Sequence, residues 1–201
     1  MIVATHSISG FFHEAVEDAI KTRRVEVTDG ATTYLVSLLS DYARPDARAE
    51  ETMERPLSFL LDEALQTAAP GERFERLRSL GDGVLYTCGF FGDHFEARGV
   101  DQKYLIAIGT TAYGAASAMM RVPASEEKTK IDIFGELADK FTCFVEVVAE
   151  VADVTIAKGS AGSRGLLKLY ERWLKTGSES LAQALTEQGL VPTRGTKGFI
   201  Q

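Results

Sequence analysis

The residues best able to do chemistry gather between positions 82 and 96. A polar stripe would form there on a helix, because its members recur at intervals of four or three. It consists of Asp82, Tyr86, Gly89 and Asp93, with His94 and Glu96 near its end. Carboxylate, imidazole and phenol groups could bind a metal ion or another ligand. The same pattern is typical of the water-facing side of a helix with a frayed end, and we favour that interpretation.

A second hypothesis places a ligand between two predicted helices, over residues 71–97 and 101–120. Haem, a metal ion or an apolar small molecule would then lie near four side chains. These are Tyr86, His94, Tyr104 and Tyr113. A haem iron could take its single axial ligand from His94 or His13. The identity of any cofactor stays unknown.

Motifs of the common enzyme and metal classes are missing. The chain has three histidines and contains neither HExxH nor the Glu-x-x-His pairs of di-iron bundles. His13 and Glu17 form one i, i+4 pair that could share a metal, but such pairs also arise by chance. There is no GxSxG, and neither cysteine stands in an activating context. We expect no metal site and no catalytic residue, and we lean against an enzyme.

The predicted helix over residues 163–176 is the most suggestive surface. Its basic side carries Arg164, Lys168, Arg172 and Lys175, and its apolar side carries Leu166, Leu167, Tyr170, Trp173 and Leu174. A basic amphipathic helix can contact anionic lipid or an acidic partner. The same pattern also suits a solvent face over a core. We name Arg164, Lys168, Arg172, Trp173 and Lys175 as candidate partner-binding residues. The glycine-rich residues 159–165 before it predict a helix-to-helix connection, with an anion site as the alternative.

Helical periodicity dominates the rest of the chain. It predicts an all-α fold, a compact bundle of seven to eight helices around a central apolar helix at about 101–120. The expected helices span about 10–24, 29–44, 56–69, 71–97, 101–120, 130–157, 163–176 and 178–189. Residues 1–191 are expected to form a single domain. A charged loop over 44–55 and a tail over 192–201 are expected to be mobile.

The central helix contains 17 consecutive residues without charge, from Tyr104 to Met120. A membrane span would need roughly 20 apolar residues, and threonines, tyrosines and glycines dilute this run. We therefore expect a helix with protein on every side. Small residues at four-residue spacing would let the helix over 71–97, with Gly81 and Gly89, approach closely.

Composition and charge narrow the classes of function that the chain could have. The net charge of −7 argues against general nucleic-acid binding, which requires a basic footprint. The first ten residues do not resemble a signal peptide, and the two cysteines lack CxxC spacing, so we expect a reducing cytoplasm. The sequence predicts a non-enzymatic protein-interaction or regulatory protein, with self-association as one possibility. The alternative is the helical ligand-binding protein described above.

One resemblance concerns residues 10–120. The segments Leu77–Asp82, Gly89–Asp93, Gly99–Asp101 and Ala112–Gly114 resemble a group of uncharacterised all-helical bacterial proteins of about 200 residues. The resemblance implies a bacterial source and brings no activity, cofactor or catalytic residue.

Overall fold

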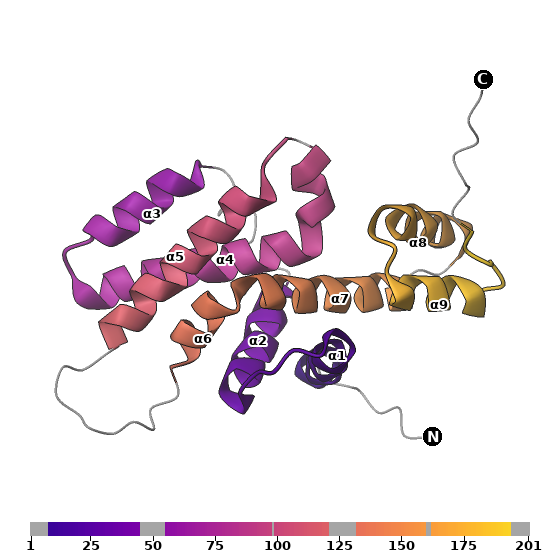
Figure 1. Cartoon of the computed structure of the whole chain (residues 1–201), viewed down its shortest axis with the longest axis horizontal. Coiled ribbons are helices and arrows are strands. Elements are labelled where there is room, and N and C mark those ends of the chain that lie inside the picture. Colours follow the sequence, from indigo (N-terminus) through magenta and orange to yellow (C-terminus); the bar gives the residue numbers. More distant parts are fainter. Residues whose placement is uncertain (1–7, 45–54, 98, 121–131, 160–161, 194–201) are drawn as a thin grey trace. The chain divides into compact units, whose positions relative to one another are not determined.

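The computed structural model describes residues 8–44, 55–97, 99–120, 132–159 and 162–193, and the side chains at 93–94, 96–97 and 162–164 lie outside that description. The predicted loop and tail also lie outside it, apart from residues 44, 55, 192 and 193. The described part of the chain is all-α, as predicted, and it contains nine helices (Figure 1). They are α1 (Ile8–Arg23), α2 (Asp29–Tyr42), α3 (Leu57–Gln66), α4 (Pro70–Ala97), α5 (Gln102–Met120), α6 (Ile133–Asp139), α7 (Phe141–Gly159), α8 (Gly162–Thr176) and α9 (Glu179–Glu187).

The chain divides into two compact units, and the boundary falls inside α7. Unit 1 spans Met1–Ala149 and unit 2 spans Glu150–Gln201. Unit 1 contains α1 to α6 and the first half of α7, whereas unit 2 contains the rest of α7 with α8 and α9. The single domain expected over 1–191 stays a prediction.

Helix α5 is the centre of unit 1, where it packs against α3, α4 and α6. Its buried side includes Leu105, Ile108, Ala112, Tyr113 and Ala116. One strip faces water, however, and consists of Tyr104, Ala107, Thr111 and Ala118. The expectation of protein on every side was therefore wrong for this strip. Alanine and threonine lie in water at little cost, so an uncharged run does not require complete burial.

Glycines on α4 and α5 make room for large side chains of neighbouring helices. A Cβ atom on Gly81 would lie 2.6 Å from the ring of Tyr113, which confirms the close approach of α4 and α5 at this position. Gly89 instead receives Val148 of α7, and Gly109 of α5 receives the ring of Phe141. Each contact fixes a helix separation, because no larger residue fits without movement.

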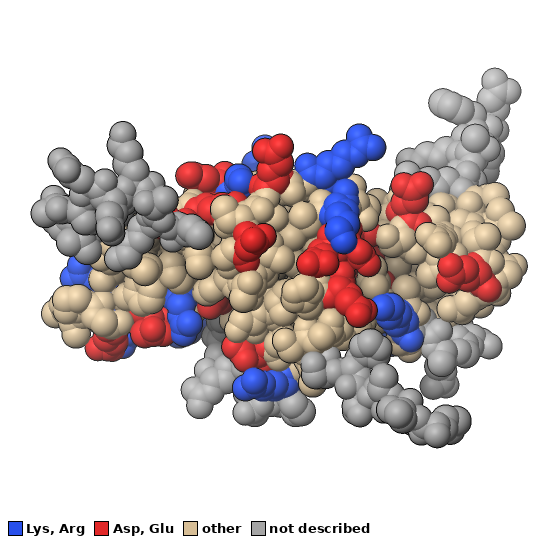
Figure 2. All heavy atoms as spheres, turned by 90° about the horizontal axis from the view of Figure 1, so that it is seen from below, with Lys and Arg blue, Asp and Glu red and all other residues tan. Residues whose placement is uncertain are grey.

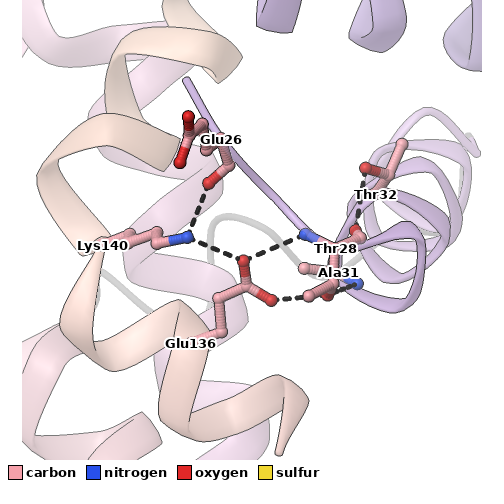
Figure 3. Close-up of polar contacts among 6 residues, drawn as sticks. All are labelled: Glu26, Thr28, Ala31, Thr32, Glu136 and Lys140. Atoms are coloured by element: carbon pink, nitrogen blue, oxygen red, sulfur yellow. Dashed lines mark hydrogen bonds and ion pairs between the residues drawn. The ribbon is translucent and has the colours of Figure 1, made fainter. Parts of the chain in front are cut away.

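The long helix predicted over 130–157 is two helices, α6 and α7. Lys140 separates them with backbone angles outside the α region (φ −110°, ψ 23°). Its ammonium group donates to the carbonyl of Glu26 at 2.6 Å and to the carboxylate of Glu136 at 3.1 Å (Figure 3). The break is associated with a contact between residues 114 positions apart, which hydrophobic periodicity does not register.

Glu136 ties α6 to the start of α2. Its carboxylate accepts bonds from the backbone N–H of Thr28 at 3.1 Å and from the Thr28 hydroxyl at 2.5 Å (Figure 3). The same hydroxyl oxygen caps α2 by accepting from the N–H of Ala31. Burial opposes the charge of Glu136, but the bonds from Thr28 and Lys140 prevail and lower its pKa. Glu136 therefore stabilises the fold as a carboxylate.

Replacing Gly109 with alanine should destabilise unit 1. The added methyl group would overlap the Phe141 ring, and overpacking of this kind costs about 1–3 kcal/mol. Urea unfolding followed by circular dichroism measures the change. Gly114→Ala on the same helix is the matched control, because its nearest neighbour would lie at an ordinary 4.0 Å. Equal stability of the two variants would contradict the proposed contact.

Glu136→Gln should lower the free energy of unfolding by about 1–2 kcal/mol near neutral pH, because an amide cannot accept every bond that the carboxylate accepts. The folded pKa lies below its ordinary value. The stabilisation is therefore present above that ordinary value and is lost as pH falls through the folded pKa. Denaturant titrations at several pH values should show the two proteins converging in acid. Glu146→Gln, at an exposed position of α7, should have a small effect throughout.

Candidate functional site

A carboxyl group lies where three helices of unit 1 meet. Tyr34 of α2 and Tyr113 of α5 each donate a hydroxyl hydrogen bond to the Oδ1 atom of Asp82 on α4, at 2.6 and 2.7 Å. The bonds join residues 48 and 31 positions apart in the sequence. Tyr113 is fully buried, and Asp82 is partly buried. The three side chains form the Asp82 cluster.

Aromatic rings surround this cluster. Phe134 of α6 makes edge contacts with Tyr34 and Phe74 and lies 5.9 Å from the ring of Tyr113. Beside the cluster, Tyr86 stacks between two other rings. They are Tyr42 at 4.5 Å and Phe90 at 4.7 Å. These contacts restrict the rotation of the tyrosines and hold their hydroxyl groups toward the carboxyl.

Burial sets the charge behaviour of the cluster. It raises the pKa of Asp82 from 3.8 to about 6, while the hydroxyl groups of Tyr34 and Tyr113 and the charge of Arg78 offset only part of this rise. Burial and the nearby carboxylate raise the pKa values of both tyrosines, so they remain donors at neutral pH. Asp82 is therefore the member of the cluster whose charge changes close to neutrality.

The polar groups of the Asp82 cluster bond to one another, and this changes the interpretation of the polar stripe on α4. Asp82 is bonded to neighbouring helices, and Gly89 is buried against α7, so the predicted water-facing side was wrong for both. Tyr86 is half-buried within the aromatic stack. The side chains of Asp93, His94 and Glu96 lie outside the described residues. The described side chains of the cluster bond to one another and join α2, α4 and α5.

Of the four residues proposed to hold a ligand, Tyr104 lies apart from the Asp82 cluster, and the side chain of His94 lies outside the described residues. Tyr86 and Tyr113 lie beside and within the Asp82 cluster. Tyr104 is 40% exposed, and its hydroxyl accepts from the N–H of Ser58 on α3 at 3.1 Å. Nine residues of helix separate Tyr104 from Tyr113, about 13 Å along the axis. Among the described side chains, the structure therefore brings Tyr86 and Tyr113 near each other, and the ligand hypothesis stays a prediction.

Comparison with known proteins adds no identity. No family model, curated protein or solved structure matches this chain. The resemblance to the bacterial helical group stays a prediction, and function has to be inferred from the geometry.

Metal and membrane sites receive no support from the described residues. His13 and Glu17 lie 3.8 Å apart on an exposed side of α1, and no third acidic, histidine or cysteine side chain joins any such pair in the described ranges. None of the described helices combines the length and apolar character that a membrane crossing requires. On the face shown in Figure 2, acidic and basic side chains are interspersed.

In unit 2, the inner side of α8 builds a small core. Leu169 and Trp173 pack with Leu181 and Leu185 of α9. All four side chains are buried. Trp173, proposed as a partner-binding residue, therefore serves the fold.

Buried charges accompany this core. Arg172 of α8 pairs with Asp153 of α7, whose side chain is 4% exposed. Burial raises the pKa of Asp153, and the charge of Arg172 and its hydrogen bond offset part of that rise. Ser180 of α9 donates to buried Glu150. Glu150 and Asp153 are therefore both buried in unit 2. Arg172 is likewise committed to an internal ion pair.

The outer side of α8 exposes large apolar side chains beside lysines. Leu167 and Leu174 are 58% and 45% exposed, although the sequence assigned both to the apolar core side. Lys168 and Lys175 are also exposed, whereas the side chain of Arg164 lies outside the described residues. At about 100° per residue, both leucines lie 100° or more around the helix from Trp173, a signal that was present in the sequence. We call Leu167, Lys168, Leu174 and Lys175 the α8 face.

Asp82→Asn should stabilise the protein at pH 8 and not at pH 4. The folded pKa is about 6 and the ordinary value is 3.8. The stability that this group contributes is therefore full below 3.8 and lost as pH rises through about 6. Asparagine keeps an acceptor for the tyrosines without the buried charge. The gain at pH 8 should approach about 2–3 kcal/mol.

Urea titrations of both proteins at pH 4, 6 and 8 measure this difference. Asp139→Asn, at an exposed position of α6, is the control and should match the stability of the original protein at each pH. An Asp82→Asn protein that is less stable than the original at pH 8 would show that the carboxylate stabilises this junction.

Proposed function

We propose that the protein is a non-enzymatic interaction protein that binds another protein through the α8 face. One observation carries the proposal, namely the exposure of Leu167 and Leu174, two turns apart on one side of α8. Two large apolar side chains that remain in water beside each other gain free energy when a partner covers them. Their position beside two exposed lysines adds a charge by which a partner could be selected.

The inner side of α8 supports the same proposal. Trp173 and Arg172 anchor the helix to α9 and α7 through a core contact and an ion pair. The α8 face is therefore presented on a helix that is packed from behind, and binding would require little ordering of that helix. The proposal includes a regulatory role, exerted by binding to that partner.

A reducing, cytoplasmic setting fits the cysteines. Cys88 and Cys143 are both free thiols. Burial raises the pKa of the Cys88 thiol to about 12, which makes it unreactive. We extend the proposal to a cytoplasmic bacterial protein on this basis and on the resemblance of its sequence.

The ligand-binding alternative has weaker support. It depends on Tyr86 and Tyr113, and the Tyr113 hydroxyl is already bonded to Asp82 at 2.7 Å. A ligand that used this hydroxyl would have to replace a buried hydrogen bond of the protein itself.

Capture of a partner from an extract of the source cells tests the proposal. Leu167→Gln combined with Leu174→Gln keeps helix-forming residues and removes the apolar surface. We expect the variant to retain at least tenfold less of the partner protein than the original chain, because hot-spot residues carry most of the binding energy. Mass spectrometry of the retained proteins measures the loss.

Phe59→Gln is the matched control, since Phe59 on α3 of unit 1 is 62% exposed. It removes an equally exposed apolar side chain from a different helix. Equal retention by the original chain, the double leucine variant and Phe59→Gln would refute a role for the α8 face. Equal loss with both variants would assign the effect to non-specific hydrophobic adsorption.

A further inference from the structure

The α8 face has two parallel ridges with the same repeat. Leu167 and Leu174 form the first, and Lys168 and Lys175 form the second. Members of each ridge are seven residues apart, about 10 Å along the axis, and the ridges run side by side. Glu171 lies on the exposed side between them. An apolar ridge with a row of lysines beside it, and one carboxylate between the two rows, offers a partner helix both apolar area and net positive charge.

We propose that the partner segment is an acidic amphipathic helix of another protein, with apolar residues at heptad spacing and carboxylates along one flank. The inference deepens the proposed function and rests on it. The partner's apolar residues would cover Leu167 and Leu174, and its carboxylates would lie against Lys168 and Lys175. Pairs of this kind flank the seam of helix dimers and set the choice of partner.

The charge on this part of the chain favours an acidic partner. Residues 158–201 contain seven lysines and arginines and three acidic residues. Arg172 pairs with Asp153, so among the described side chains of α8 the exposed positive charge next to the leucines comes from Lys168 and Lys175. Opposite charges across an interface accelerate association and exclude partners of the wrong sign.

A second copy of the chain fits the α8 face poorly. In an antiparallel pair the lysine ridges would face each other. In a parallel pair they would face the flank that carries Tyr170 and Gly177, which offers no carboxylate. Neither arrangement brings the lysines a carboxylate other than Glu171, so self-association has less charge complementarity than an acidic helix supplies.

An anionic membrane surface is also less suitable. Glu171 lies between the leucine and lysine ridges, so a flat lipid surface that contacted both would receive this carboxylate as well. A helix built for anionic lipid places basic residues beside its apolar face instead. A protein helix can place a neutral or basic side chain opposite Glu171.

The test uses the full chain and two synthetic helical peptides of three heptads. Both peptides carry leucine at the seam positions. One carries glutamate along the flanks, and the other carries lysine at the same positions. Fluorescence anisotropy of the labelled peptides measures binding. We expect the acidic peptide to bind, with an affinity that falls as salt rises, and the basic peptide to bind at least tenfold more weakly.

Exchange of the charges gives the decisive comparison. Lys168→Glu with Lys175→Glu should weaken binding of the acidic peptide by about tenfold or more and strengthen binding of the basic peptide. Lys103→Glu, at an exposed position of α5 in unit 1, is the control and should leave both affinities unchanged. Leu167→Gln with Leu174→Gln should weaken binding of either peptide.

Several outcomes would overturn the inference. They are absence of binding by the acidic peptide, equal affinity for both peptides, and binding of phosphatidylserine vesicles in place of the peptide with dependence on the same lysines. If partner capture still depends on Leu167 and Leu174 while the acidic peptide fails, only the partner class is refuted. If capture is independent of both leucines, the proposed function fails first.

Discussion

The junction at Asp82 is the constraint around which unit 1 is arranged. One carboxylate oxygen accepts hydroxyl groups from α2 and α5, so three helices meet at a single atom. A buried polar group without partners would cost more than an apolar residue in the same place. The junction therefore depends on the orientation of both tyrosines, which the rings of Phe134 and its neighbours restrict. The glycine at position 81 serves the same end, because it allows Tyr113 to reach Asp82 from α5.

The two units illustrate different uses of buried charge. Among the described residues, Asp82 accepts its hydrogen bonds from two neutral hydroxyl groups, and its burial favours the uncharged acid. Asp153 has the guanidinium of Arg172, and loss of either member would leave the other charged and buried. Unit 2 is small, with a core built mainly from α8 and α9. Its ion pair leaves α8 fixed on one side and exposed on the other.

Hydrophobic periodicity predicted the helices well because their cause is local. The predicted end of the last helix is confirmed, for example, since Gly189 has a positive φ of 84° and the N–H of Leu190 returns to the carbonyl of Leu185. The break at Lys140 could not be predicted in this way, because the contact associated with it involves Glu26. Asp82 was misassigned for a similar reason. Its partners are distant in the sequence, and a carboxylate in a polar stripe is usually solvated.

On α8, the sequence analysis divided the side chains between solvent and core in a way that the structure corrects. Arg172 and Trp173 were selected as the most distinctive side chains of α8, yet distinctive residues also build cores. The angular position of each residue around the helix separates Leu167 and Leu174 from Trp173. A broad division into a basic and an apolar side does not. The sequence could not reveal that Arg172 forms an ion pair with Asp153.

Trp173 is the chain's single tryptophan, and it is buried in unit 2. Five of the six tyrosines belong to unit 1. The molecule thus has an intrinsic optical label: indole emission reports the surroundings of α8 and α9, and near-ultraviolet signals of tyrosine report mainly the other unit. Spectroscopy can follow the two units separately, without the introduction of a dye.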